Sequence, residues 1–477
     1  MAMAAIETDY LIIGSGAVGL AFADTLIDEC DADVVIVDRH GKPGGHWNDA
    51  YSFVALHQPS AFYGVNSMPL GNNRKDSIGA NQGLFELASG PEVSGYFDNV
   101  MRQKLLPSGR VRYFPMADYT GSGRFRSLLS GEETTVSVRR KTVDATYYGT
   151  SVPATHRPRY AVADDVRLIT PNALPQLWID QTIRQSDKGI DARPHHYVIV
   201  GAGKTAMDTA VWLLSSGAPP QSITWVVPRD SWLLNRLRTQ PGLEFFHETI
   251  GGQADLMEAF ANAQSVDELF LKLEAADIML RIDPKVKPGM FHYATMSKGE
   301  VATLQRITNV IRLGRVQSID ATGLTLDDGH VPMGEGTLYI DCTASAVEPR
   351  PAMPIFNGSL ITPQLVRAPQ PAFSAALVAF VEAHYPDDDT KNNLCRTVPF
   401  PHTMDQYPAC NLVNMMNQMA WSQDPLLSKW LLRSRLDGFG KVIAAIDKND
   451  AEKMAVLSRL RGNAMAAAGN LQKLSGF

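Results

Sequence analysis

Two glycine-rich segments of the same kind constrain this chain more than any other feature of its sequence. The first, YLIIGSGAVGLAFADTLID, occupies residues 10–28, and the second, YVIVGAGKTAMDTAVWLLSSG, occupies residues 197–217. In each, an apolar run leads into glycines and then into apolar residues at helical spacing, which predicts a buried strand, a tight turn and a helix. Such a unit directs the backbone amides of a helix N-terminus at a phosphate. The sequence therefore predicts two dinucleotide-binding units.

The composition is that of an ordinary globular protein. The 477 residues are 45% hydrophobic and 20% charged, which is enough chain for two or three domains. A formal net charge of −6 gives no electrostatic reason to expect a nucleic acid or an anionic membrane as a partner. No CxxC pair occurs among the cysteines, and the N-terminus lacks a signal-peptide pattern, so we expect a reducing, cytoplasmic location.

In the first unit the glycines follow the pattern GxGxxG at Gly14, Gly16 and Gly19. The first permits the tight turn, the second lets a pyrophosphate approach the backbone, and the third lets the helix pack closely on the strand. A second apolar strand, residues 34–37, leads into Asp38, whose carboxylate can accept hydrogen bonds from both ribose hydroxyls. Because a 2′-phosphate would meet like charge there, Asp38 favours FAD or NAD. The alternative is a purely structural glycine turn.

The second unit has Gly201-x-Gly203-x-x-Ala206, with alanine as the third small residue. Its next strand, residues 223–227, is followed by Arg229, and no acid stands at the ribose position. An arginine there suits a 2′-phosphate through charge-assisted, bidentate hydrogen bonds, so we predict NADPH rather than NADH. The alternative for Arg229 is a solvated surface charge.

Other charged residues near the second unit are less specific. Arg236 and Arg238 lie just beyond Arg229, and Lys204 could contact a phosphate. Lys204 stands too close to Gly201 for the P-loop pattern GxxxxGK[ST], so nucleotide hydrolysis is not expected. No group of histidine and acidic residues has metal-ligand spacing, and no nucleophile elbow GxSxG occurs.

Two such units, with an acid after the first and an arginine after the second, resemble the two-dinucleotide flavoprotein superfamily. More narrowly, the chain resembles the flavin-containing monooxygenases, including their Baeyer–Villiger and N-hydroxylating relatives. DRHGKPGGHW, residues 38–47, is similar to the family's ribose acid and Gly-Gly-x-Trp turn, and residues 50–71 are similar to the stretch that lines the flavin ring. VDATYYGTSVP, residues 143–153, and YIDCTASAVEP, residues 339–349, stand where the family has its two Ala-Thr-Gly segments.

This chain also departs from the family pattern. The family's hallmark is an aromatic-x-Gly followed three residues later by histidine, whereas here Tyr147-x-Gly149 precedes His156 by six intervening residues. His156 is either a displaced hallmark residue or a solvated linker residue. Both Ala-Thr-Gly segments are altered as well.

The resemblance implies site residues at the matching positions. The predicted cofactor-binding residues are Gly14, Ser15, Gly16, Ala17, Gly19, Asp38, Arg39, Gly45, His46, Trp47, Ala145, Thr146, Thr343, Gly201, Gly203, Lys204, Thr205, Ala206 and Arg229. His57 and Gln58 are the candidates for catalytic polar groups beside the flavin, where a donor could bond to flavin N5 or to a peroxide. The alternative for both is a loop residue bonded to backbone. No metal site is expected.

The implied fold is α/β, with two Rossmann-like domains and the NADPH domain inserted in the FAD domain. We predict the FAD domain over residues 1–165 and 326–477, the latter including C-terminal helices, and the NADPH domain over residues 166–325. A helical insertion over residues 252–282 has no counterpart in a minimal nucleotide domain, and residues 93–106 should form an amphipathic helix.

The implied function is an NADPH-dependent FAD monooxygenase that uses O₂ to oxidise a small molecule through a C4a-(hydro)peroxyflavin. The reaction would be heteroatom hydroxylation or Baeyer–Villiger oxygen insertion, in a dry site capped by residues 60–80 or 252–296. One alternative is an NAD(P)H-dependent flavoprotein reductase without oxygen insertion, and another is a non-catalytic FAD/NAD(P)-binding redox sensor. The helical tail after Trp421 could serve a homodimer interface.

Overall fold

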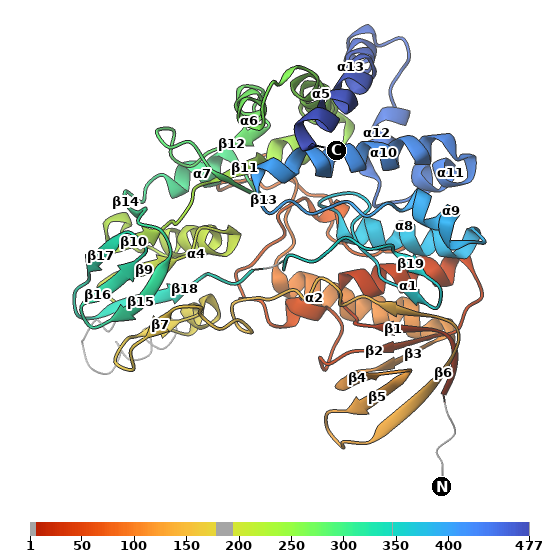
Figure 1. The fold of residues 1–477 in the computed structure, drawn as a ribbon, viewed down its shortest axis with the longest axis horizontal. Helices are drawn as coiled ribbons and strands as arrows, with labels where there is room; N and C mark the ends of the chain where they lie inside the picture. Colours follow the sequence, from red (N-terminus) through yellow and green to blue (C-terminus); the bar gives the residue numbers. More distant parts are fainter. Residues whose placement is uncertain (1–5, 178–193, 346, 477) are drawn as a thin grey trace.

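Two parallel sheets form the frame of the molecule, and each carries one of the glycine-rich turns (Figure 1). The computed structural model describes residues 6–177, 194–345 and 347–476. Part of the N-terminus for which no signal peptide was predicted lies outside these residues. In the part of the chain that is described, no helix combines the length and the apolar character needed to cross a membrane.

The first sheet has the parallel order β20-β6-β1-β2-β3. Its strands are β1 Ile6–Ile13, β2 Val34–Val37, β3 Val111–Phe114, β6 Glu133–Asp144 and β20 Leu360–Ile361, with β19 Phe356–Asn357 antiparallel to β20 and a hairpin of β4 Ala117–Gly121 and β5 Arg124–Ser127 joined to β6. The helices α1 Ala17–Glu29 and α8 Pro371–His384 pack together in the core of this unit.

The second sheet repeats this order with β8-β18-β9-β10-β14, and all of its strands are parallel. Its strands are β8 Leu168–Ile169, β9 His196–Val200, β10 Ile223–Val226, β14 Asn309–Ile311 and β18 Thr337–Asp341. A smaller sheet is formed by β7 Ala161–Val162, β15 Val316–Asp320, β16 Gly323–Leu326 and β17 Gly329–Pro332. The helix α4 Lys204–Ser215 buries Met207, Ala210 and Leu214 in this unit's core.

The chain order shows that the second unit is inserted in the first. After β6 the chain leaves the first sheet, forms every described strand from β7 to β18 elsewhere, and returns with β19 and β20 beside β6. The predicted fold class, one Rossmann-like unit within another, is therefore confirmed.

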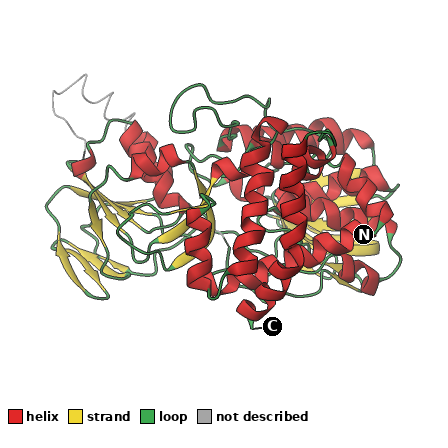
Figure 2. Cartoon of the chain, turned by 90° about the horizontal axis from the view of Figure 1, so that it is seen from above, coloured by secondary structure: helices red, strands yellow, loops and turns green. Residues whose placement is uncertain are grey.

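A third, mainly helical layer joins the two units (Figure 2). The insertion supplies β11 Ser231–Asn235, α5 Gly252–Asn262, α6 Val266–Ala275, β12 Met279–Leu280, β13 Met290–Met296 and α7 Lys298–Leu304. The C-terminal part supplies α9 Asp388–Leu394, α10 Tyr407–Gln423, α11 Pro425–Arg433, α12 Gly438–Ala444 and α13 Ala451–Ser475. Aromatic residues of both parts share one core, in which Phe270 and Phe291 pack against Tyr407.

Two predicted helical segments differ in detail. The insertion is not helical to residue 282, because Met279 and Leu280 pair with β11 as a strand. The helix predicted over residues 93–106 begins earlier, at α2 Gly90–Asn99, because Ser89 and Glu92 form a capping box. It continues as a π-helix to Leu105.

Candidate dinucleotide sites

The two glycine turns have the same geometry. Gly14 and Gly201 have φ values of +97° and +123°, which a residue with a side chain rarely adopts. A Cβ atom on Gly201 would lie 2.7 Å from the carbonyl oxygen of Cys342, and one on Gly14 would lie 3.0 Å from Thr146 Cγ2. Both turns therefore require glycine for the conformation and for the space.

An Asp-x-Thr turn lies beside each glycine turn. In the first unit, Thr146 donates to Asp144 Oδ1 from its amide at 2.9 Å and from its hydroxyl at 2.6 Å. In the second, Thr343 makes the same bonds to Asp341 Oδ1 at 3.1 and 2.6 Å. The two altered Ala-Thr-Gly segments therefore form the same kind of turn, one in each unit. Thr343 lies in the turn of the second unit.

The structure gathers most of the predicted cofactor residues at the carboxyl ends of the two sheets. The first group consists of Gly14, Ser15, Gly16, Ala17, Gly19, Asp38, Gly45, His46, Trp47, Ala145 and Thr146, and the second consists of Gly201, Gly203, Lys204, Thr205, Ala206, Arg229 and Thr343. Ligands of open α/β sheets bind at such ends. Arg39 lies apart from the first group, because its exposed guanidinium pairs with Asp118 at 2.6 Å.

Asp38 is a buried acid directly after β2, with only 6% of its surface exposed. One carboxylate oxygen accepts from the amide and hydroxyl of Ser15, and the other accepts from the amide and ring Nδ1 of His40. Burial opposes ionisation of Asp38, but the hydrogen bonds from His40 and Ser15 outweigh it and lower its pKa. A ribose could bind this carboxylate by replacing the side-chain donors while both backbone amides stay bonded.

His40 is a functional candidate that sequence reasoning missed. Its ring lies between two carboxylates, 2.9 Å from Asp38 Oδ1 and 2.8 Å from Asp49 Oδ2. The bond to Asp38 is the largest cause that raises the pKa of His40 to about 9, against the opposing effect of burial. The ring is therefore cationic at neutral pH. Only the spacing of Asp38 and His40, two residues apart in DRH, could have indicated it.

Strand register identifies the corresponding position in the second unit. Ile13 faces Val37 across β1 and β2, and Val200 faces Val226 across β9 and β10. The residue one step further is Asp38 in the first unit and Val227 in the second. By the same count, Arg229 corresponds to His40.

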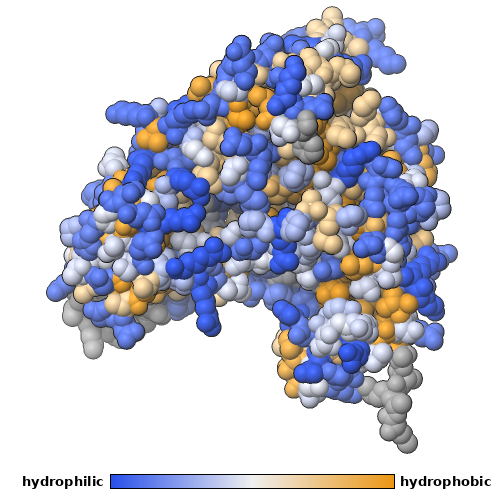
Figure 3. All heavy atoms as spheres, in the orientation of Figure 1, coloured by the Kyte–Doolittle hydropathy of each residue, from blue (hydrophilic) through white to orange (hydrophobic). Residues whose placement is uncertain are grey.

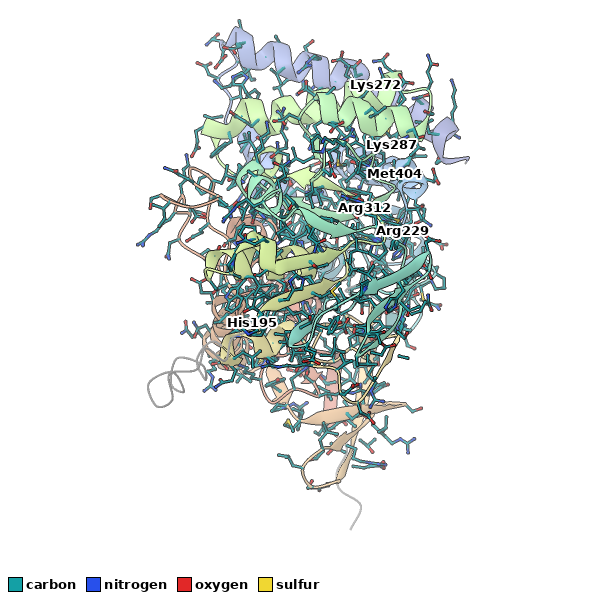
Figure 4. All side chains as sticks on the ribbon, turned by 90° about the vertical axis from the view of Figure 1, so that its left-hand side faces the viewer. His195, Arg229, Lys272, Lys287, Arg312 and Met404 are labelled. Carbon is teal, nitrogen blue, oxygen red and sulfur yellow. The ribbon has the colours of Figure 1, made fainter. Side chains whose placement is uncertain are left out.

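Arg229 is exposed at the rim of the second unit. Among the described residues it has no hydrogen-bond or ion-pair partner, whereas Arg312, on the same side of the unit, is held by both oxygens of Asp230 (Figure 4). The second unit thus replaces a buried carboxylate by a buried valine and adds an uncompensated cation. This arrangement fits a 2′-phosphate better than a free ribose hydroxyl pair.

Three other basic residues of the second unit, Arg236, Arg238 and Lys204, bind protein groups. Arg236 is completely buried, and Arg238 donates to the carbonyl oxygens of Glu248, Ala276 and Asp277. Both guanidinium groups are therefore engaged by protein acceptors rather than directed at a phosphate. Lys204 forms an ion pair with Asp208, which also accepts a 2.8 Å hydrogen bond from Tyr51 of the first unit.

The two turns differ in how closely neighbouring backbone covers them. The loop after β2 folds back over the first turn, with Gly44 donating to the Ser15 carbonyl at 2.9 Å. A Cβ on Gly45 would lie 2.9 Å from Gly16 Cα, so only glycine leaves this narrow cradle free. A Cβ on Gly203 would have no neighbouring atom within 4 Å, so the second turn is open. We take the closed cradle to fit FAD and the open one to fit an exchangeable nucleotide.

His46 and Trp47 shape the first cradle. Trp47 donates from Nε1 to the Tyr63 hydroxyl at 2.8 Å and meets the Tyr63 ring edge-on. Burial lowers the pKa of His46 to about 4, which keeps its ring neutral. Both residues are therefore placed for packing rather than for proton transfer.

The two candidate catalytic residues differ in their surroundings. His57 lies where the first-unit loop meets the second unit, and its carbonyl accepts a 3.0 Å hydrogen bond from Arg236 Nε. Burial, with the nearby charges of Lys204 and Arg236, holds the pKa of His57 well below its ordinary value. Gln58 makes only a long contact of 3.5 Å to the Phe62 carbonyl within its own loop.

His156 is not a solvated linker residue. Its side chain is only 10% exposed, and Nε2 lies 3.1 Å from the Thr343 hydroxyl. Within the described residues, no group of three or more histidine, cysteine or acidic side chains could hold a metal ion.

Comparison with known proteins places the chain in a family. Residues 12–72 match the model of an NAD(P)-binding Rossmann-like domain. Uncharacterized protein Rv2000 from Mycobacterium tuberculosis and Uncharacterized protein Mb2023 from Mycobacterium bovis are each 45% identical over 469 residues, covering 98% of this chain and 84% of theirs. The polycyclic ketone monooxygenase of the fungus Thermothelomyces thermophila, at 14% identity and a TM-score of 0.50, aligns over 99% of this chain and 88% of its own. The chain therefore belongs to the same family as the two mycobacterial proteins, and it shares the fold of the fungal enzyme.

Proposed function

We propose that this protein is an FAD- and NADPH-dependent monooxygenase that uses O₂ to oxidise a small molecule, by heteroatom hydroxylation or Baeyer–Villiger oxygen insertion. The observation that carries the proposal is the contrast between the two nucleotide units. The first has a buried carboxylate at its ribose position, and the second has Val227 and Arg229, which has no partner among the described residues. The fold shared with a polycyclic ketone monooxygenase supports the same assignment.

The first unit would hold FAD. Asp38 would bind the adenosine ribose, and the amides at the N-terminus of α1 would bind the pyrophosphate. FAD, when bound, supplies the hydride acceptor and the group that activates O₂. The family model that matches residues 12–72 is named for NAD(P), and we assign FAD to this unit because its cradle is closed by Gly45 and its acid excludes a 2′-phosphate.

The second unit would bind NADPH reversibly. Its open turn at Gly203 gives access to the α4 N-terminus, and Arg229 would pair with the 2′-phosphate. Lys204 is already paired with Asp208, so the helix amides rather than this lysine would provide most of the phosphate contacts.

The residues between the units would keep water from the reacting groups. Tyr51 of the first unit bonds to Asp208, and Phe53 stacks on Trp212 at 5.0 Å. The surface of the molecule is hollowed between the two units on the face shown in Figure 3. We place His57 beside the flavin as a neutral group that can accept a proton or a hydrogen bond, since burial and two nearby cations disfavour its charged form.

The test begins with the protein as purified. We expect bound FAD and faster reduction of that FAD by NADPH than by NADH under anaerobic conditions. Reoxidation under ¹⁸O₂ with a panel of cyclic ketones and sulfides should place the label in a product. Reduction by NADPH with hydrogen peroxide as the only oxygen product would indicate a reductase or oxidase, and FAD that NADPH cannot reduce would indicate a redox sensor.

A further inference from the structure

One completely buried arginine joins the two nucleotide units. The guanidinium of Arg236 donates from Nε to the His57 carbonyl at 3.0 Å, from Nη1 to Asn81 Oδ1 and Glu300 Oε2, and from Nη2 to the Thr295 carbonyl at 3.0 Å. His57 and Asn81 belong to the first unit, whereas Thr295 and Glu300 lie in β13 and α7 of the insertion, which is part of the second unit. Each unit therefore supplies two of the four acceptors.

The buried guanidinium of Arg236 has a hydrogen-bond acceptor for each of its nitrogens and a carboxylate to balance its charge. Burying an arginine without a partner is costly, and Glu300 supplies the opposite charge. Burial disfavours the Glu300 carboxylate, but the charges of Arg236 and Lys204 and the hydrogen bonds from Ser297 and Arg236 together outweigh it and lower its pKa. Glu300 is itself held by the capping box that begins α7, in which Ser297 donates from its amide at 2.7 Å. An apolar residue could fill the same space within the second unit, but it could not bind the two first-unit acceptors.

Neighbouring contacts hold the same first-unit loop. Ser297 donates from its hydroxyl to the Ala80 carbonyl at 2.8 Å, and the Phe85 amide donates to Gln240 Oε1 at 2.8 Å. A Cβ on Gly299 would lie 2.3 Å from the Ala80 carbonyl oxygen, so the two backbones meet without room for a side chain. The loop around residues 80–85 thus packs directly against the second unit, and Arg236 is buried in this contact.

We propose that Arg236 is a positioning residue: by holding the His57 carbonyl and the Asn81 side chain, it fixes the flavin-side loop against the NADPH unit and sets the alignment for hydride transfer. This inference rests on the proposed function. The low pKa of His57, to which the charge of Arg236 contributes, agrees with this placement. The arginine acts through His57 and Asn81 and contacts neither nucleotide site.

Arg238 provides a matched control. It is the next arginine in the chain, two residues on, and it donates to three backbone carbonyls, those of Glu248, Ala276 and Asp277. All three belong to the insertion, as do Thr295 and Glu300, but among the described residues Arg238 makes no hydrogen bond to the first unit. Arg236→Lys keeps a cation for Glu300 and removes the planar fork, and Arg238→Lys makes the same chemical change.

The experiment compares the two variants as holoenzymes. A small misplacement of reacting groups can cost on the order of 100-fold in rate, so we expect Arg236→Lys to slow flavin reduction by about 10- to 100-fold at saturating NADPH. The KM for NADPH should change by less than about threefold, because no nucleotide contact is lost. Arg238→Lys should reduce its flavin at the native rate. Equal rates in both variants would overturn the inference.

Two measurements on the cofactor-free protein do not depend on turnover. Amide hydrogen exchange around residues 80–85 should become faster in Arg236→Lys and stay native in Arg238→Lys. The His57 ring, assigned in NMR spectra with a His57→Gln variant, should titrate at higher pH in a neutral Arg236→Gln variant, because one nearby cation is removed. Unchanged exchange and titration would refute the positioning role.

Asn81→Ala is the alternative variant if Arg236→Lys does not fold. Asn81 is half-buried, and its truncation leaves the ion pair between Arg236 and Glu300 intact. It should show a smaller decrease in reduction rate and the same change in exchange. A native protein whose FAD is not reduced by NADPH would refute the proposed function instead, and the exchange contrast between Arg236→Lys and Arg238→Lys would still decide whether Arg236 holds the loop.

Discussion

The two nucleotide units use one backbone plan and differ at two side chains. Both have five parallel strands in the same order, a glycine with positive φ after the first strand, and an Asp-x-Thr turn beside that glycine. At the positions that strand register makes equivalent, the first unit has Asp38 and His40, and the second has Val227 and Arg229. The comparison teaches that the frame provides a phosphate-facing helix, while one or two residues beyond the second strand decide which ribose it accepts.

The units also differ in access. In the first, the loop from Gly44 to Trp47 covers the glycine turn, whereas the space above Gly203 is open. A covered site suits a tightly bound cofactor, and an open site suits a nucleotide that binds and dissociates in each turnover. The predictions below test this difference, from the largest expected effect to the smallest.

Substituting the second glycine of each fingerprint should separate the two sites most strongly. Gly16→Leu should lower FAD retention by more than about 100-fold, because its side chain would occupy the place where a pyrophosphate approaches the backbone. Gly203→Leu should leave FAD bound and abolish reduction by NADPH. Flavin absorbance after gel filtration and anaerobic reduction rates measure both effects.

The control for these substitutions is Gly16→Ala, whose Cβ would lie at an ordinary 3.6 Å from Gly45 Cα and should leave the fold intact. Loss of FAD from the Gly203→Leu protein would contradict the division of roles between the units.

Asp38→Asn should weaken FAD binding by about 10- to 100-fold, because hydrogen bonds to a charged acceptor are worth roughly 1.5–3 kcal/mol. FAD titration of the cofactor-free variant measures the change. Arg39→Ala is the matched neighbour and should bind FAD as the native protein does, since Arg39 pairs with Asp118 at the surface. Equal losses in both variants would show that the acid is not the ribose contact.

Arg229→Ala should raise the KM for NADPH by about 10-fold through loss of a charge-assisted contact and leave the KM for NADH almost unchanged. Steady-state reduction with each nucleotide makes NADH an internal control. If both KM values rise together, the 2′-phosphate is bound elsewhere or NADH is the donor.

His40 should give a smaller, pH-dependent effect. Its pKa is raised from 6.5 to about 9 by Asp38 and Asp49, so its pairing stabilises the fold fully below about pH 6.5 and is lost as the pH rises through about 9. We expect native protein to melt a few degrees above His40→Gln near pH 6 and the gap to close by pH 10. A gap that widens with pH would contradict the cationic assignment of His40.

The sequence predicted the parts of the site that local geometry determines. The positive φ of Gly14 and Gly201 and the positions of Asp38 and Thr343 just after strands follow from short patterns within one unit. The insertion of one unit in the other is confirmed for the same reason, because each unit is recognisable by itself.

Side-chain partners from distant segments could not be read in this way. In the sequence, Lys204, Arg236 and Arg238 are all basic residues near the second glycine turn. In the structure, Lys204 pairs with Asp208, whereas Arg236 binds acceptors from both units and Arg238 binds three backbone carbonyls. Likewise, the burial of His156 against Thr343 depends on two segments far apart in the chain.

The sequence by itself determined where the backbone must turn sharply and where phosphates can approach it, because glycine spacing and apolar periodicity act over a few residues. The tertiary structure alone decided which charges remain free. A charged side chain takes the nearest partner once the chain is packed, and for Arg236 those partners, His57 and Asn81, lie in another unit. Arg229 stays unpaired among the described residues because β10 ends at the rim, where the fold brings no acid to it.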